Sequence, residues 1–395
     1  MTLQNIATEL IELIALHLES DADLNALCRT SRLFYHLFNK HLYRQDAHKA
    51  CKALLWGSSA GLVSTVNKSL EHDADINVSN PEGETPPFLA VRNQRMDMVR
   101  LLLAKGPSLR HRNRDRNSIV YLAASIGNAD LVRILLTLGA DPNGPQFGYD
   151  TPMLAAVRRG DLEVVKAIFE AGSYMDEADE MGETPLQVVV SCAQHDILAF
   201  FLDNGILRED SAWFRGARAL EIAIANQDIH TLKLLLEGGA NSVALWPDGR
   251  NAIMNAAASG EDDMAILMTE KLVDPAEIKD EYGRGLLWYA VRGRCEKYTE
   301  VLLDKGLGPL TLNRWIPLTG AILGGSTKIV ELLLDRGATL DYKDDIRRTP
   351  LRIAFEAGQR GVVKLLVKKG ASLEEAKLDD VQMELMQKFL ASSSE

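Results

Sequence analysis

The chain has 395 residues, of which 44 are lysine or arginine and 55 are aspartate or glutamate, so its formal net charge is −11. Hydrophobic residues make up 46% of the sequence, which is typical of a folded protein and excludes a largely disordered chain. The acidic balance argues against direct nucleic-acid binding, because contacts to phosphates need a basic surface.

Targeting signals and cysteine usage favour an intracellular protein, cytoplasmic or nuclear. No charge-free stretch reaches the roughly 18 apolar residues that a membrane span needs, so we expect no membrane partner. The first residues lack a basic segment, and Glu9 and Glu12 interrupt their apolar run, which predicts no signal peptide. The four cysteines lie far apart, which favours free thiols in a reducing compartment.

Residues 1–48 predict a small module of three helices. The first helix has an apolar face with helical spacing, formed by Ile6, Leu10, Leu13, Ile14 and Leu18. A second helix carries Leu24 and Leu27 and follows residues with capping-box spacing. A third contains Leu33, Phe34, Leu37 and Phe38.

This module resembles the F-box family, through residues 6–14, 23–29 and 32–34, although Ala7 stands where the family has proline. In that family the apolar helical face docks on the Skp-type adaptor of cullin–RING ubiquitin ligases. The resemblance implies an adaptor-binding face made of Ile6, Leu10, Ile14, Leu24 and Leu27. The alternative is that these helices only cap the structure that follows them.

A repeat of about 33 residues organises residues 49–372. A small residue recurs in short apolar runs at Gly57, Ala90, Ala123, Ala156, Val189, Ala223, Ala256, Ala290, Ala321 and Ala354. Sixteen residues later comes a second marker, which is glycine in most units. Each unit predicts two short antiparallel helices, the first opened by Thr-Pro in several cases. Because one helix pair cannot bury its own apolar face, about ten units must stack into a solenoid.

The array resembles the ankyrin repeat family, through motifs such as Gly-Glu-Thr-Pro-Leu at 182–186 and Gly-Ala-Asp-Pro-Asn at 139–143. The expected fold is therefore all-α, an ankyrin solenoid with hairpin fingers. The family's histidine after Thr-Pro-Leu is absent, and its place holds Trp288 in one unit. Two units lack the leucine and glycine markers, which predicts irregularity there and a bend or hinge near residues 270–282. An F-box joined to such an array is an arrangement known from filamentous fungi.

The end of the chain predicts a cap for the solenoid. Leu378, Val381, Leu385 and Phe389 have helical spacing within residues 373–390, with charges between them. We expect residues 391–395 to form a flexible tail.

No catalytic or metal-binding pattern is present in the sequence. The eight histidines form neither a HExxH motif nor a cluster with cysteine, and the acidic pairs lack the spacing of a calcium loop. We therefore expect no enzymatic activity, no cofactor and no metal.

Arginine residues indicate where a protein client could bind. The resemblance implies binding along the concave face, where Arg92, Arg158 and Arg159 lie near the ends of first helices. Alternation along an extended finger would place Arg114 and Arg116 on one side of it. Such a basic patch would favour a client with an acidic segment, and a merely solvated finger is the alternative.

Aromatic residues near later fingers are further candidates for client contacts. Trp213, Trp246 and Tyr282 lie at or near these fingers, and tryptophan and tyrosine are favoured anchors of binding hot spots. Packing between adjacent fingers is the alternative.

The predicted function is a non-catalytic adaptor, the substrate-receptor subunit of an SCF-type ubiquitin ligase. The F-box-like helices would bind the Skp-type adaptor while the repeats hold a client near the ubiquitin-charged partner. The alternative is an ankyrin transcriptional co-regulator that binds a transcription factor in the nucleus, with residues 1–48 acting only as a cap.

Overall fold

The computed structural model describes residues 43–44, 46–47, 51–143, 150–207, 212–246, 248–270, 272–308, 316–344, 346–376 and 378–391. These residues form paired α-helices, one 3₁₀ helix and two isolated β-bridges, which confirms the predicted all-α repeat fold. The adaptor-facing residues Ile6, Leu10, Ile14, Leu24 and Leu27 lie outside the described residues.

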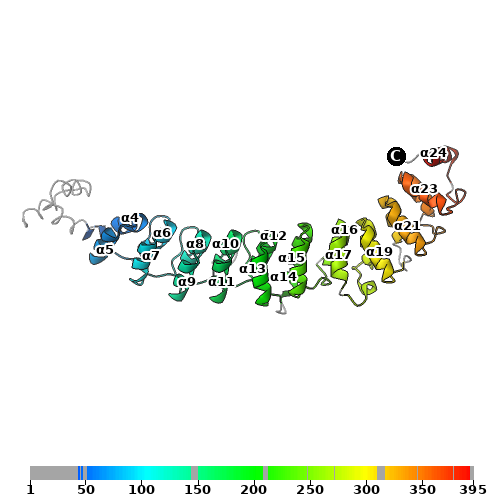
Figure 1. Cartoon of the computed structure of the whole chain (residues 1–395). Helices are drawn as coiled ribbons and strands as arrows, with labels where there is room; N and C mark the ends of the chain where they lie inside the picture. Colours follow the sequence, from blue (N-terminus) through cyan, green and yellow to red (C-terminus); the bar gives the residue numbers. More distant parts are fainter. Residues whose placement is uncertain are drawn as a thin grey trace, which may run out of the picture. The chain divides into compact units, whose positions relative to one another are not determined.

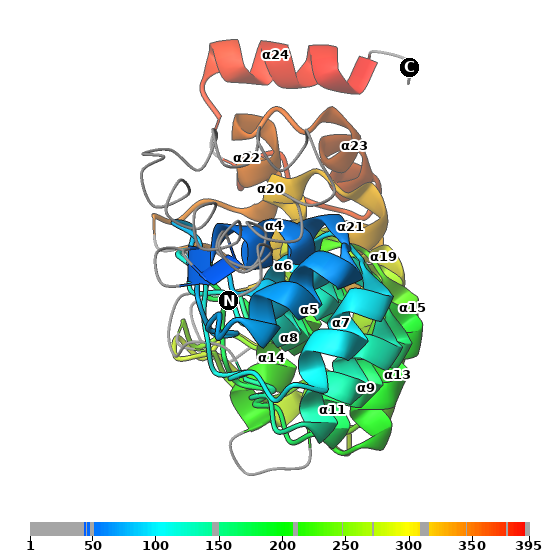
Figure 2. The same cartoon turned by 90° about the vertical axis from the view of Figure 1, so that its left-hand side faces the viewer.

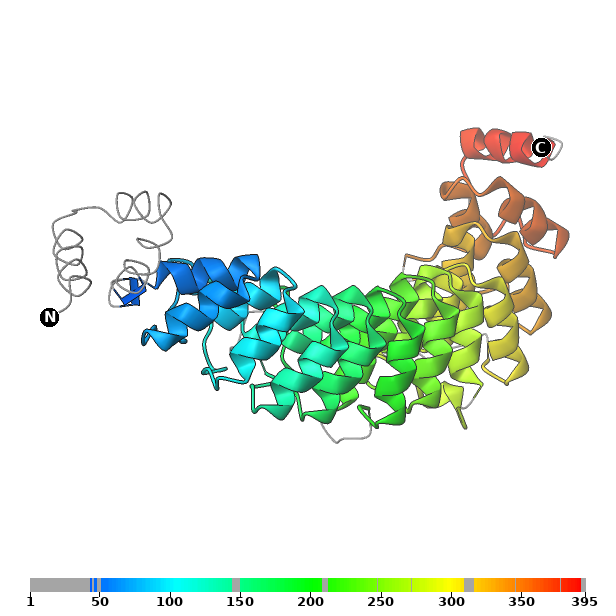
Figure 3. The same cartoon turned by 60° about the vertical axis from the view of Figure 1, so that its left-hand side comes forward.

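The chain divides into two compact units, one ending at Val188 and the other beginning at Val189. In the first unit, the inner helices stack on one another and an outer helix follows each of them (Figures 1 and 3). The pairs are α4 (Lys52–Ala60) with α5 (Val63–Glu71), α6 (Pro86–Arg92) with α7 (Met96–Leu103), α8 (Ile119–Ile126) with α9 (Ala129–Thr137), and α10 (Pro152–Arg159) with α11 (Leu162–Glu170). The unit boundary falls inside the inner helix α12 (Pro185–Ser191).

The second unit continues the same alternation of inner and outer helices. It contains α13 (His195–Asp203), α14 (Ala212–Ala225), α15 (Ile229–Glu237), α16 (Ala252–Ser259), α17 (Asp262–Thr269), α18 (Leu286–Arg292), α19 (Glu296–Asp304), α20 (Pro317–Gly324), α21 (Thr327–Asp335), α22 (Pro350–Glu356) and α23 (Arg360–Lys368). Inner helices α14, α16, α18, α20 and α22 each contact the next, so the stack is continuous through this unit.

The repeated small residues hold the inner helices close together. Ala90, Ala123, Ala156, Ala256 and Ala290 are fully buried. The first leucine of each pair near the end of an outer helix is buried as well, as at Leu102, Leu135, Leu235, Leu302 and Leu333. Burying one such side chain contributes about 1.5–3 kcal/mol, so the array is stabilised mainly by this repeated apolar layer.

The helix ends follow from the capping residues. Thr151 and Thr349 accept hydrogen bonds from the backbone N–H groups of Leu154 and Arg352, at 3.1 and 3.3 Å, as Thr-Pro predicts. The prediction is wrong for Thr85 and Thr184, whose side chains make no capping bond. The markers Gly106, Gly139, Gly172, Gly205, Gly239, Gly306, Gly337 and Gly370 all have positive φ, the left-handed conformation that glycine adopts without strain.

The two units without markers are irregular in different ways. Asp73 takes the place of the second glycine in the first repeat and has φ of +64°. In the seventh, Thr269 replaces the buried leucine, and its hydroxyl lies 2.7 Å from the hydroxyl of Tyr298. A 3₁₀ helix follows at Pro275–Glu277, while α16 still contacts α18 and α17 contacts α19. The division into compact units thus falls at Val188, and the helix stack continues across residues 270–282.

The C-terminal helix α24 (Asp380–Ala391), at the end of the stack in Figure 2, contacts α23, but its predicted apolar face is only partly right. Val381 and Leu385 are 70% and 44% exposed, whereas Met386 is fully buried and the Phe389 ring lies 5.5 Å from that of Phe355. The helix begins only at Asp380, so a spacing counted from Leu378 includes residues that are not helical.

Candidate functional site

The fingers that join one helix pair to the next share a tight turn. Its first residue donates its N–H to the carbonyl oxygen four residues on, at 3.0–3.1 Å, and its side-chain oxygen accepts the N–H of that same residue at 2.7–2.9 Å. The residues at this first position are Asn80, Asn113, Asp179, Asp280 and Asp344. The turn therefore fixes the residues at the finger tip, where partners of repeat arrays can bind.

The turn corrects the expected arrangement of the arginine-rich finger. Asn113 accepts the N–H of Arg116 at 2.9 Å, and Arg116 has φ of +64°, so the extended backbone ends before the tip. The alternation that would align Arg114 and Arg116 on one side is therefore lost. Both arginines are exposed on the turn.

Two of the predicted client-binding arginines form ion pairs within the chain. Arg92 pairs with Glu84, and Arg158 pairs with both Asp150 and Asp179. Glu84 and Asp179 are 2% and 3% exposed, so removing either arginine would leave a buried carboxylate unpaired, at a cost of roughly 3–5 kcal/mol. Arg92 and Arg158 thus have a structural role, and the basic patch is smaller than predicted.

Arg159 is also held against its neighbouring repeat. Its Nη1 donates a hydrogen bond to the carbonyl oxygen of Ser125 at 3.3 Å. Its Nε lies 2.0 Å from the point that a Cβ at Gly127 would occupy, so glycine makes room for this side chain. Arg114 and Arg116 are exposed on their turn, and neither lies against a buried carboxylate of the described residues as Arg92 and Arg158 do.

The predicted aromatic anchors lie in different parts of the array. Trp213 lies in α14. Trp246 opens a finger turn in place of Asx and donates its N–H to the carbonyl oxygen of Arg250 at 2.6 Å; its side chain is half-buried. Tyr282 stands at the tip of its finger and is 64% exposed, with the Arg284 guanidinium 4.7 Å from its ring centre. Of Trp246 and Tyr282, Tyr282 is thus the one exposed enough to contact a partner protein.

Asp280 organises the finger that carries Tyr282. Its carboxylate accepts hydrogen bonds from the N–H groups of Tyr282 and Arg284 at 2.9 and 2.8 Å, from Arg284 Nε at 2.5 Å and from the Tyr289 hydroxyl at 2.6 Å. Burial alone would raise the pKa of Asp280, but the bonds from Tyr289 and Arg284 hold that pKa below its usual value. Burial and the Asp280 charge raise the pKa of Tyr289 to about 12.

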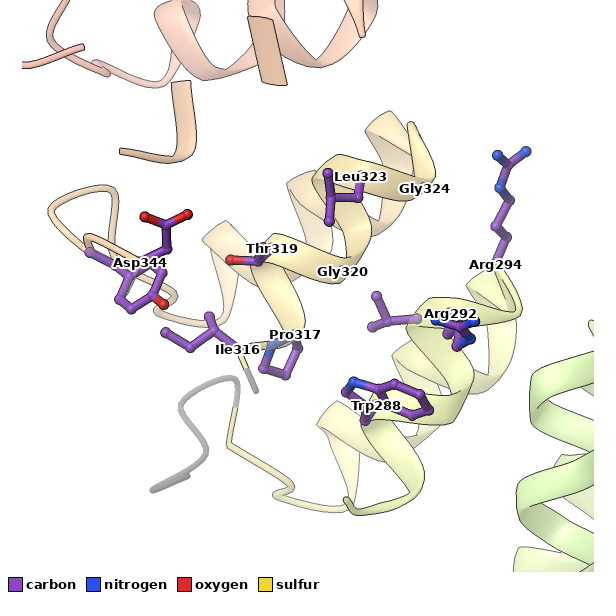
Figure 4. Close-up of a pocket in the computed structure, with 12 residues that line it drawn as sticks. Trp288, Arg292, Arg294, Ile316, Pro317, Thr319, Gly320, Leu323, Gly324 and Asp344 are labelled. Carbon is purple, nitrogen blue, oxygen red and sulfur yellow. The ribbon is translucent and has the colours of Figure 1, made fainter. Parts of the chain in front are cut away.

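Next to this finger, a hollow of about 490 Å³ opens between the inner helices α18 and α20. Trp288, Arg292 and Arg294 border it from the side of α18, and Pro317 and Leu323 border it from α20 (Figure 4). The Trp288 ring centre lies 4.5 Å from the Arg284 guanidinium and 5.4 Å from that of Arg292. Such a volume is within the range of ligand-binding clefts.

Two residues at this hollow depart from the repeat pattern, and the search for motifs did not identify either of them as part of a site. Trp288 occupies the position of the family's histidine after Thr-Pro-Leu. Arg294 occupies a position that is glycine in six repeats and has φ of +59°, which costs a non-glycine residue of the order of 1 kcal/mol. The preceding residue, Gly293, must be glycine for a different reason: a Cβ there would lie 1.8 Å from the Ala257 carbonyl oxygen.

The described residues show no metal-binding cluster, and two of their three cysteines, Cys51 and Cys295, are buried. No group of three or more His, Cys, Asp or Glu side chains among them is placed to hold a metal ion. Burial raises the pKa of the Cys295 thiol to about 12, and Cys51 is likewise buried with a raised pKa, so neither is a reactive thiolate. None of the helices described is long and apolar enough to cross a membrane.

Comparison with known proteins places the array among repeat sequences. A family model described as ankyrin repeats (3 copies) matches residues 47–146, 220–313 and 307–376. The chain is 26% identical over 216 residues to the ankyrin repeat and KH domain-containing protein mask-1 of Caenorhabditis elegans, 24% over 331 residues to the E3 ubiquitin-protein ligase KEG of Arabidopsis thaliana, and 32% over 167 residues to the ankyrin repeat protein nuc-2 of Neurospora crassa.

These similarities are confined to part of each relative. They extend over 54%, 79% and 40% of this chain, but over only 8%, 18% and 15% of the three relatives. The activities of those whole proteins therefore do not transfer to this chain.

Proposed function

The chain belongs to the ankyrin repeat family, and from that premise we propose that it is the substrate receptor of an SCF-type ubiquitin ligase. Ankyrin repeats are protein-interaction modules, and the family is generally non-catalytic. Residues 1–48 would dock on the Skp-type adaptor through Ile6, Leu10, Ile14, Leu24 and Leu27, while the inner helices and fingers hold a protein client. Ubiquitin transfer would then depend on proximity alone.

The observation that carries the client-binding part is the hollow between α18 and α20. Trp288 and two arginines border it, and tryptophan and arginine are the residues that most often dominate interface energetics. The exposed Tyr282 belongs to the finger next to α18. The adaptor-binding part is supported by the F-box resemblance of residues 3–45, in which Ala7 replaces the usual proline.

The exposed part of the arginine-rich finger is a second client-contact candidate within the same function. Arg114 and Arg116 are both exposed on the turn of this finger. Substituting Arg114 and Arg116 by glutamate is expected to weaken client binding without lowering the melting temperature. Unchanged client binding would remove these two residues from the proposed contact surface.

Co-purification of the full chain with a Skp-type adaptor tests the adaptor-binding part. We expect a stoichiometric complex with the wild-type chain and none with the Leu10→Asp, Leu24→Asp double variant, provided that its circular dichroism spectrum is unchanged. The absence of a complex with the wild-type chain would contradict the ligase role. The transcriptional co-regulator would then be the better proposal, with residues 1–48 as a cap.

A further inference from the structure

Opposite charges eight residues apart form a repeated ion pair on the inner face of the array. The first charge is at the base of a finger and the second at the end of the inner helix that follows. The pairs are Glu84 with Arg92, Asp150 with Arg158, and Arg348 with Glu356. In the last pair the basic residue comes first and the acidic residue second, and the ion pair still forms. The feature that the three repeats share is therefore opposite charge at these two positions.

The repeat of α18 breaks this complementarity. Both positions hold arginine there, Arg284 and Arg292, so the acidic partner that Arg92 and Arg158 have within the chain is replaced by a like charge. Arg284 is compensated by the buried Asp280, at 2.5 Å. Arg292 and the nearby Arg294 make no ion pair with any residue that the structure describes.

Asp344 is the one acidic side chain among the described residues that line the hollow. Its carboxylate accepts a hydrogen bond from Arg348 Nε at 2.7 Å and another from the Arg348 N–H at 2.7 Å. Its negative charge is therefore already engaged. The hollow consequently retains the positive charge of Arg292 and Arg294.

Apolar surface lies beside this positive charge. Leu323 is 56% exposed although it belongs to an inner helix, and Pro317 and the Trp288 ring line the hollow with it. A ligand that complements the site thus needs both a carboxylate and an apolar side chain. A protein segment that contains Asp or Glu next to a large apolar residue has this chemistry.

We propose that the hollow between α18 and α20 binds an acidic peptide segment of a partner protein. A carboxylate of the segment is the counter-ion of Arg292, as Glu84 is of Arg92 and Asp150 of Arg158. A second acidic group contacts Arg294, and an apolar side chain lies against Trp288 and Leu323. This inference rests on the proposed role of the array as a protein-binding surface and names the chemistry of its partner.

Selection from a random peptide library tests the proposal without a known partner. Displayed 12-residue peptides are selected on the purified full chain, and the best binders are measured by fluorescence anisotropy. We expect the selected peptides to combine Asp or Glu with a large apolar residue. Selection of peptides without acidic enrichment, or of none that bind at the hollow, would overturn the proposal.

Charge-reversal variants locate the binding site. Arg292→Glu with Arg294→Glu is expected to weaken the selected peptides about 10- to 100-fold, the loss expected for charge-assisted hydrogen bonds. The control Lys305→Glu with Lys368→Glu reverses two exposed charges that also lie at helix C-termini, and should change binding less than twofold. Equal effects of the two double variants would mean non-specific attraction and would contradict a site in the hollow.

The melting temperature of Arg292→Glu tests the like-charge pair of Arg284 and Arg292. The carboxylate introduced by Arg292→Glu faces Arg284 with the charge order of Arg348 and Glu356, so the melting temperature should be unchanged or higher. A clear drop would contradict the like-charge pair on which the proposal depends.

Single-stranded DNA of 12 nucleotides serves as a competitor, because arginine and tryptophan can also hold a nucleic acid. The net charge of −11 opposes this, so we expect no displacement of the peptide at physiological salt, and displacement would overturn the choice of a peptide ligand. The Skp-type adaptor should bind the Arg292→Glu, Arg294→Glu variant as it binds the wild-type chain. A failure of the peptide-binding proposal can thus be distinguished from a failure of the adaptor-binding proposal.

Discussion

Replacing Asp280 by asparagine tests how the finger next to α18 is held. The substitution keeps the shape of the side chain and one oxygen for the N–H groups of Tyr282 and Arg284. It places an amide NH₂ against Arg284 Nε, where a carboxylate oxygen now accepts at 2.5 Å. The variant therefore loses a charge-assisted bond and leaves a guanidinium without its partner.

The cost follows from the burial of this carboxylate, which is fully buried. A hydrogen bond to a charged group contributes about 1.5–3 kcal/mol, and leaving a buried charge unpaired costs more, so we expect a local destabilisation of about 2–4 kcal/mol. Asp248 makes the same type of contact with Arg250, at 2.6 Å, but is 43% exposed. Asp248→Asn should therefore cost less than about 1 kcal/mol.

Hydrogen exchange measured by mass spectrometry is the suitable assay, because repeat arrays open locally as well as globally. Amides of residues 278–292 should exchange about 30- to 1000-fold faster in Asp280→Asn, since each 1.4 kcal/mol is a factor of ten. Amides of α7 and α9 should be unaffected. Equal effects of Asp280→Asn and Asp248→Asn on their own fingers would show that burial of the carboxylate does not set the cost.

Two further predictions concern packing and pH. Gly293→Ala should lower the free energy of unfolding in urea by roughly 1–3 kcal/mol, because its Cβ would lie 1.8 Å from the Ala257 carbonyl oxygen. The control Gly285→Ala meets nothing closer than 3.7 Å and should be nearly neutral. Similar urea midpoints for the two variants would contradict the close approach of α16 and α18. Burial would raise the pKa of Asp228, but the hydroxyl and N–H of Thr231, together with His195, lower it to about 2. Because this folded pKa lies below the ordinary value, the stabilisation is present above about pH 4 and is lost as the pH falls towards 2, by about 2 kcal/mol. Asp228→Asn should remove that part of the pH dependence of the melting temperature, and an unchanged slope between pH 4 and 2 would show that other carboxylates cause it.

Repetition explains how much of the fold was predictable. The small residues at Ala90, Ala123 and Ala156 each have the same environment, so ten weak local signals add up to one strong signal for stacked helix pairs. The C-terminal helix occurs once and has no such support. Its buried residue, Met386, is determined by where the helix starts and by which side meets α23, and neither is encoded by spacing alone.

The candidate site was predictable only in part. The exposed Tyr282 was identified from its place in a finger, and Arg92 and Arg158 from their place on inner helices. The sequence does not show that a buried carboxylate neutralises each of these two arginines, because that depends on contacts between a finger and a helix. The like charges of Arg284 and Arg292 can be recognised as unusual only because the structure shows ion pairs at the same two positions in three other repeats.

We propose that one chain holds two partners at separate surfaces. Sedimentation velocity of the full chain with a Skp-type adaptor and a selected acidic peptide measures whether both bind at once. We expect a ternary complex, in which Leu10→Asp with Leu24→Asp removes only the adaptor and Arg292→Glu with Arg294→Glu removes only the peptide. Mutually exclusive binding, or loss of both partners in either folded variant, would mean that the two partners do not occupy separate surfaces.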